Sequence, residues 1–125
     1  MPKDKKLFNR CERLWKEIVK LRAGHKSELS GLPADPAHPH HCLGKSTYAL
    51  RFDIRGGMCI TAGEHFQAHS TDNFRINEKI REVLKNREGK NIIEILEIQK
   101  RRTKINLQIV EMQLKEELKK LKEEL

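Results

Sequence analysis

Residues 38–69 read HPHHCLGKSTYALRFDIRGGMCITAGEHFQAH, and four histidines in this stretch form one pattern. His40 and His41 are adjacent, and His65 and His69 follow about two dozen residues later at a spacing of four. One member of the doublet can bind a metal ion together with His65 and His69, which leaves the other member free as a general base. This is the minimum set of groups for a phosphodiesterase that uses a single metal ion.

The residues between the two histidine pairs predict two short strands joined by a turn. Residues 48–54 (YALRFDI) alternate apolar and polar side chains, and residues 58–60 (MCI) form a short apolar run. Arg55-Gly56-Gly57 lies between them and is typical of a tight turn with positive φ.

A helix is predicted to follow the second strand. Thr61 and Glu64 match a capping box, in which each side chain satisfies a backbone group at the start of the helix. A helix that begins there places His65 and His69 one turn apart on the same face.

Helices are also predicted on both sides of this module. Apolar residues recur every three or four positions over residues 6–21, which predicts a helix that ends at Ala23-Gly24. Residues 25–39 contain three prolines within seven positions, which predicts an extended loop. After Asn73 the chain is helical in character, with a break at residues 87–89. Residues 91–125 are too long and polar to fold back entirely on so small a core, so they either pack beside the first helix or pair with a second copy in a homodimer.

Length, net charge and cysteine content narrow the possible domain size, partners and cellular compartment. The 125 residues predict one small domain with an appendage, and a net charge of +8 favours a polyanionic partner, with nucleic acid the first choice. A solvated, lysine- and glutamate-rich helical protein is the alternative explanation of the charge. No apolar run approaches the roughly 20 residues that span a bilayer, so no membrane association is expected. Three widely spaced cysteines without a C-x-x-C favour a reducing cytoplasm.

Residues 38–69 resemble the HNH nucleases of the ββα-metal (His-Me finger) superfamily, especially small phage-encoded HNH proteins. The likeness rests on the doublet, the basic segment after it, the glycine turn and the later histidine pair. It implies an α+β fold with a basic N-terminal helix, a small ββα-metal module and a helical C-terminal tail. The corresponding units are residues 1–75 and residues 76–125.

The resemblance also implies residue roles. His41 matches the family's general base, and His40, His65 and His69 match the ligands of one divalent metal ion. Imidazole ligation favours the softer members among Mg²⁺, Mn²⁺, Ni²⁺ and Zn²⁺. Lys45, Arg51 and Arg55 are candidates for gripping DNA phosphates beside the metal, with ordinary surface solvation as the alternative.

This chain departs from the family pattern at two places. Gly56 stands where the family's middle asparagine braces the base, so the backbone, Asp53 or a water has to replace that side chain. Relatives often carry cysteine pairs that bind a structural zinc, whereas this chain has Ser27, Ser30 and Glu64 at the corresponding positions. A serine hydroxyl does not replace a thiolate on zinc, so no structural zinc is expected and Cys59 is expected in the core.

The function predicted from these features is metal-dependent cleavage or nicking of DNA, in the cytoplasm of a bacterial or phage-infected cell. His38 is expected to be a solvent-facing loop residue, with a role as a backup ligand the alternative. Two rival functions remain at this stage. One is a catalytically weakened or inactive DNA-binding or architectural protein that retains the fold. The other is an interaction module whose histidines hold a purely structural metal.

Overall fold

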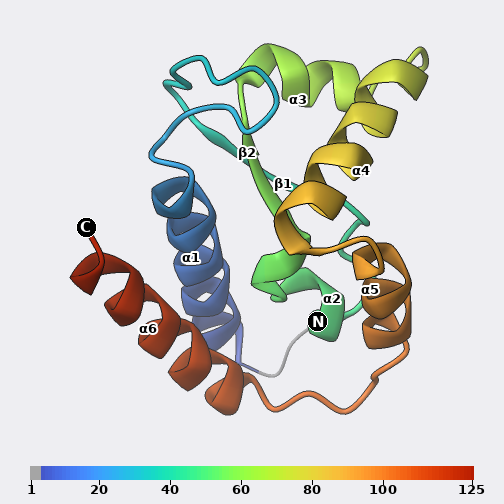
Figure 1. The fold of residues 1–125 in the computed structure, drawn as a ribbon. Coiled ribbons are helices and arrows are strands. Elements are labelled where there is room, and N and C mark those ends of the chain that lie inside the picture. Colours follow the sequence, from blue (N-terminus) through green and yellow to red (C-terminus); the bar gives the residue numbers. More distant parts are fainter. Residues whose placement is uncertain (1–3) are drawn as a thin grey trace.

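The computed structural model describes residues 4–125, which form a mostly helical chain around one two-stranded antiparallel sheet (Figure 1). Residues 1–3 of the predicted first unit lie outside the described residues. The mixed helix-and-sheet class expected from the sequence is confirmed. The elements in chain order are α1 (Lys5–Arg22), β1 (His38–His41), α2 (Tyr48–Arg51), the 3₁₀ turn η1 (Ile54–Gly56), β2 (Gly57–Ile60), α3 (Ala62–Ala68), α4 (Phe74–Glu88), α5 (Ile92–Lys100) and α6 (Leu107–Glu123).

Helix α1 confirms the predicted amphipathic helix and its end. The Asp4 carboxylate caps its first turn by accepting a hydrogen bond from Leu7 N at 3.0 Å, and Ala23 is its C-cap. Its apolar side is buried in one core cluster, where the indole of Trp15 lies. The N–H of that indole donates to the carbonyl oxygen of Asp53 at 3.1 Å, which joins α1 to the segment before β2.

The strand predicted over residues 48–54 is wrong. The Thr47 side chain accepts a hydrogen bond from Leu50 N and starts the short helix α2 there. The alternation was misleading because α2 lies between two core clusters: Tyr48 and Phe52 contact one, and Leu50 is buried in the other. Burial on two sides produces apolar residues at a spacing of two in a helix as well as in a strand.

The partner of β2 is the histidine segment itself, which was expected to be a loop up to Pro39. β1 pairs antiparallel with β2 in the register His38↔Ile60, Pro39↔Cys59, His40↔Met58 and His41↔Gly57. Pro39 has no N–H to donate, and the N–H and the carbonyl oxygen of its partner Cys59 bond to Glu28 instead. The predicted positive-φ turn at 55–57 is also wrong, because residues 54–56 form η1 and Gly57 has φ −95°.

The hairpin has two covered faces, because directly opposed residues of an antiparallel pair point to the same side. Met58 and Ile60 are buried in the cluster formed with α3, α4 and α5, whereas Cys59 is buried in the cluster formed with α1 and α6. Gly57 lies so close to α1 that a Cβ there would be 2.5 Å from Val19 Cγ2 and 2.8 Å from Trp15 Cζ2. Close approach, not backbone freedom, therefore requires glycine at position 57.

The C-terminal region folds back on the rest of the chain. α4 ends at Gly89, with φ 107°, at the break predicted for residues 87–89. The single run expected over residues 91–125 is instead two helices, and α6 lies along α1 (Figure 1). Leu114 and Leu118 are buried against α1, and the Arg10 side chain donates to Glu111 at 2.5 Å. Packing beside the first helix, one of the two arrangements considered, is observed for α6, whereas α5 packs in the other core cluster; pairing with a second copy stays a prediction.

Among residues 4–125, no helix combines the length and the apolar character needed to cross a membrane.

Candidate metal centre

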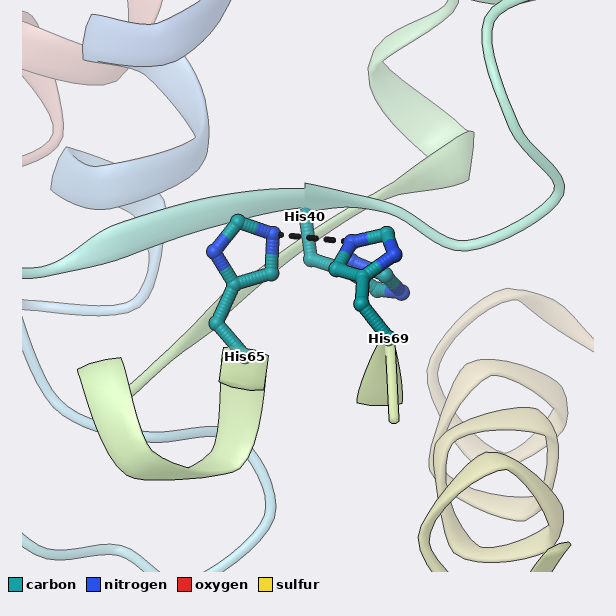
Figure 2. A group of neighbouring side chains, drawn as sticks. All are labelled: His40, His65 and His69. Atoms are coloured by element: carbon teal, nitrogen blue, oxygen red, sulfur yellow. Dashed lines mark hydrogen bonds between the residues drawn. The ribbon is translucent and has the colours of Figure 1, made fainter. Parts of the chain in front are cut away.

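Three of the predicted site residues come together between β1 and α3. His40, His65 and His69 each offer a ring nitrogen, and these three atoms lie within 4.8 Å of one another (Figure 2). His40 extends from the strand toward the two helical histidines, whose Nε2 atoms are 3.2 Å apart. The ring centroid of His40 is 5.3 Å from that of His65 and also 5.3 Å from that of His69. A single ion can therefore reach all three rings after small side-chain rotations.

Local structure explains why these rings converge. The predicted capping box is present: Glu64 N donates to Thr61 Oγ1 at 3.1 Å, and Thr61 N donates to Glu64 Oε1 at 2.8 Å. This fixes the first turn of α3, and the four-residue spacing then places His65 and His69 on the side that faces β1. His40 reaches them because it is opposite Met58, on the face of the hairpin that α3 covers.

The environment favours the neutral forms of His40 and His65. Burial, followed by the neighbouring rings of His65 and His69, lowers the pKa of His40 to about 4. Burial and then His69 also lower the pKa of His65. Metals bind the neutral form of imidazole, so the lowered pKa values of His40 and His65 favour metal binding near pH 7.

The donor set fits a divalent metal ion. Nδ1 of His40 is buried and has no hydrogen-bond partner within the described part of the chain, so this ring keeps a nitrogen that an ion or a water can satisfy. His40 is buried, His65 half-buried and His69 exposed, so the group opens toward solvent on one side. Three protein ligands with one open side are typical of catalytic rather than structural zinc-type sites.

His41, the predicted base, lies on the opposite face of β1. Its ring stacks in parallel on Trp15, with ring centroids 4.0 Å apart and planes 5° apart. Burial lowers the pKa of His41 to about 4, and the positive charges of Lys45 and Arg51 contribute. The structure therefore does not bring His41 into the group formed by the three ligands, although His40 and His41 are consecutive residues at the end of the same strand.

The three predicted phosphate-binding residues differ in their surroundings. Lys45 is exposed in the loop after β1. Arg51 forms an ion pair with Glu12 of α1, and its guanidinium lies 4.9 Å from the ring centroid of Phe8. Arg55 pairs with Asp53 at 2.7 Å and is 41% exposed, so its outer side remains accessible.

The position of the family's asparagine is occupied by backbone contacts. Cys42 N donates to the carbonyl oxygen of Gly56 at 2.9 Å, which ties the residue after His41 to η1. Gly56 N donates in turn to the carbonyl oxygen of Asp53 at 3.1 Å. Neither hydrogen bond involves the side chain of His41, so a backbone replacement for the asparagine stays a prediction.

The residues that were compared with the zinc-binding cysteines of HNH proteins form a hydrogen-bonded cluster. Ser27 is buried and donates from Oγ to Glu64 Oε1 at 2.6 Å. The same Oγ accepts hydrogen bonds from Leu29 N at 3.0 Å and Ser30 N at 3.1 Å. These bonds attach the loop after α1 to the first turn of α3. Cys59 is fully buried, as expected.

Comparisons of the chain with protein-family models, curated proteins and solved structures found no match. Any assignment of function therefore depends on the residues and their geometry.

Sequence reasoning gave too little weight to two residues. His38 is half-buried on β1, not in a solvent-facing loop, and its Nδ1 is 3.0 Å from Nδ1 of His65. Because alternate residues of a strand point to the same side, assigning residues 38–41 to a strand would have placed His38 on the same face as His40. Trp15 was recognised only as an apolar residue of the first helix, because its stacking on His41 joins segments far apart in the sequence.

Proposed function

We propose that this protein is a metal-dependent HNH-type endonuclease that hydrolyses phosphodiester bonds in DNA. The observation that carries the proposal is the convergence of His40, His65 and His69 around one point, with an open side toward solvent. The order of the elements supports it, because ligands from a hairpin strand and from the helix after the hairpin match the resemblance in residues 38–69.

In this proposal the metal ion acts as a Lewis acid on the phosphate. When bound, a divalent metal polarises the scissile phosphate and stabilises the departing oxygen. Three imidazole ligands, His40, His65 and His69, add no negative charge to the ion, so its full charge would act on the substrate. The bacterial or phage-infected cytoplasm predicted from the sequence belongs to the same proposal.

His41 is the proposed general base. Its lowered pKa keeps the ring unprotonated near neutral pH, so it can accept a proton from an attacking water. His40 and His41 are the last two residues of β1, so a phosphate bound across the end of the strand lies next to both faces. The stacked indole of Trp15 holds the imidazole in one orientation.

Positive charge supports a nucleic-acid substrate. The chain carries a net charge of +8, and Lys45 is exposed four residues after His41. Arg51 lowers the pKa of His41 together with Lys45, which means that both cations act on the same region as the base. Contacts of this kind hold the sugar–phosphate backbone and give little base specificity.

A second candidate is a DNA-binding or architectural protein that holds a metal without cleaving DNA. It is favoured by the position of His41, which packs on Trp15 and faces away from the three ligands.

A plasmid-nicking assay with Mg²⁺, Mn²⁺ and Ni²⁺ distinguishes the two candidates. We expect the wild type to nick supercoiled DNA and His41→Ala to lose at least about a hundredfold in rate, the usual contribution of a general base. His25→Asn is a matched control, because His25 is exposed outside the site and has φ 57°, which asparagine tolerates. DNA binding without cleavage under every metal would favour the architectural candidate.

A further inference from the structure

His38 is a fourth histidine at the candidate metal centre, but it occupies a different place from the other three. It lies two residues before His40 on β1, so both side chains extend from the same face of the hairpin. Its ring is 5.2 Å from that of His65, centroid to centroid, and the two Nδ1 atoms are 3.0 Å apart. His65 therefore lies between His38 and His69.

The two nitrogens of His65 face different neighbours. Its Nε2 is 3.2 Å from Nε2 of His69, and its Nδ1 is 3.0 Å from Nδ1 of His38. The nitrogens of one imidazole ring point away from each other, so a single ion cannot contact both. An ion shared with His69 uses Nε2 of His65, which leaves Nδ1 directed at His38.

Two unprotonated ring nitrogens would repel each other at this distance, so one of them carries a hydrogen. A neutral imidazole that gives the lone pair of Nε2 to a metal carries its hydrogen on Nδ1. Nδ1–H of His65 then donates to Nδ1 of His38, which accepts while its own hydrogen is on Nε2. His38 thus favours the one tautomer of His65 in which Nε2 is available to the ion.

We propose that His38 is a positioning residue, which accepts a hydrogen bond from His65 and fixes the tautomer and ring orientation that the metal requires. This inference rests on the metal centre of the proposed function. Ligating histidines commonly donate their second N–H to a carboxylate, a carbonyl oxygen or a water, and here a neutral imidazole takes that place. It differs from the alternative in which His38 is itself a ligand, because its Nδ1 lies on the side of His65 turned away from His69.

Two substitutions of His38 test the role of the acceptor atom. His38→Ala removes the acceptor, whereas His38→Asn places an amide oxygen near the position of Nδ1 and restores it. The probe is Zn²⁺ alone, titrated into the full chain by isothermal calorimetry, with His25→Asn as the control. We expect His38→Ala to weaken Zn²⁺ binding by roughly 10- to 100-fold. We expect His38→Asn and His25→Asn to stay within about threefold of the wild type.

A long-range ¹H–¹⁵N spectrum of the zinc-loaded wild type provides a reading that a loss of packing would not change. We expect His65 to carry its hydrogen on Nδ1 and to bind zinc through Nε2, and His38 to carry its hydrogen on Nε2. Zinc coordination by His38, or by Nδ1 of His65, would overturn the inference. Unchanged affinity in His38→Ala would also overturn it, as would equal weakening in His38→Ala and His38→Asn.

The outcomes separate this inference from the nuclease proposal. If the effect of His38→Ala on Zn²⁺ binding is found but no metal supports DNA cleavage, the positioning role stands and the nuclease proposal fails. If DNA is cleaved but His38→Ala binds Zn²⁺ like the wild type, only the positioning role fails. A wild type that binds no Zn²⁺ would overturn the role of His38 together with the metal centre.

Discussion

The two faces of the β1–β2 hairpin hold histidines in opposite circumstances. On the face covered by α3, His40 meets the rings of His65 and His69, and a buried nitrogen of His40 has no hydrogen-bond partner among residues 4–125. On the face covered by α1, His41 is packed in parallel against Trp15. Consecutive residues of one strand thus differ in what they can do: one face is suited to binding an ion, and the other holds a single ring in place.

The comparison also separates two ways of lowering a pKa. Burial is the largest cause for both His40 and His41. The next cause differs, because neighbouring histidines act on His40 whereas Lys45 and Arg51 act on His41. On the face of His40, a bound metal ion would add positive charge. The positive charge that acts on the second face comes from Lys45 and Arg51 of the chain itself.

The largest expected effect is on Zn²⁺ affinity, which should depend on His40 of the α3 face and not on His41 of the α1 face. His40→Ala removes one of three ligands and should weaken Zn²⁺ binding by at least about a hundredfold, more than the loss of an outer-shell partner. His41→Ala should leave Zn²⁺ affinity within about threefold, because its ring faces α1. Isothermal titration calorimetry on both variants checks this. Equal losses in the two variants would show that His41 also binds the ion.

A second prediction concerns the close packing of the α1 face. Gly57→Ala places a Cβ against Trp15 and Val19 and should lower the free energy of unfolding by about 1–3 kcal/mol, the usual cost of overpacking. Gly56→Ala is the matched control, because its Cβ would lie 3.7 Å from Leu96 Cδ1 in ordinary contact. Urea denaturation monitored by Trp15 fluorescence measures both. Similar stability of the two variants would contradict the account of the hairpin.

A third prediction concerns the cluster that attaches the loop after α1 to α3. Ser27→Ala leaves the N–H groups of Leu29 and Ser30 without their acceptor and should cost about 1–3 kcal/mol of unfolding free energy. Ser46→Ala, at an exposed serine, should change it by less than about 0.5 kcal/mol. Thermal or urea unfolding compares them. An unchanged midpoint for Ser27→Ala would mean that the loop is held by other contacts.

A fourth prediction concerns the pH dependence of the stability of the metal-free protein. The pKa of His40 is about 4 in the folded chain and about 6.5 when unfolded, so the unfolded state binds more protons between these values. The contribution of His40 to stability is complete above pH 6.5 and is lost as pH falls toward 4. We expect a decrease of about 1–3 kcal/mol across this range. His40→Gln should make the curve shallower but not flat, because the pKa of His41 is also lowered to about 4. An identical curve for this variant would contradict the assignment.

Local signals for helices were reliable guides, whereas the local turn signal at residues 55–57 was wrong. The capping box at Thr61 and Glu64 and the spacing of His65 and His69 depend on adjacent turns of one helix, so the helical part of the candidate site could be predicted. The amphipathic pattern of α1 and the break at Gly89 depend on similarly short distances along the chain.

Signals that depend on distant segments were less informative. The strand at residues 38–41 contains Pro39, and a proline normally argues against a strand because it has no N–H to donate. The strand is possible here because Cys59, the residue opposite Pro39, bonds to Glu28 instead, which the sequence does not reveal. The alternation over residues 48–54 had two explanations, and the two core clusters on either side of α2 select the helix. The contact between His38 and His65 requires the position of β1 against α3, which no sequence pattern specifies.

The central claim is that His40, His65 and His69 bind one divalent metal ion on the α3 face of the hairpin. Anomalous diffraction at the zinc edge, from crystals of the full chain grown with Zn²⁺, tests it most directly. We expect one strong peak about 2.0–2.1 Å from a nitrogen of each of these three histidines. A structure in which these three rings share no zinc ion, or in which zinc binds elsewhere on the chain, would contradict the account.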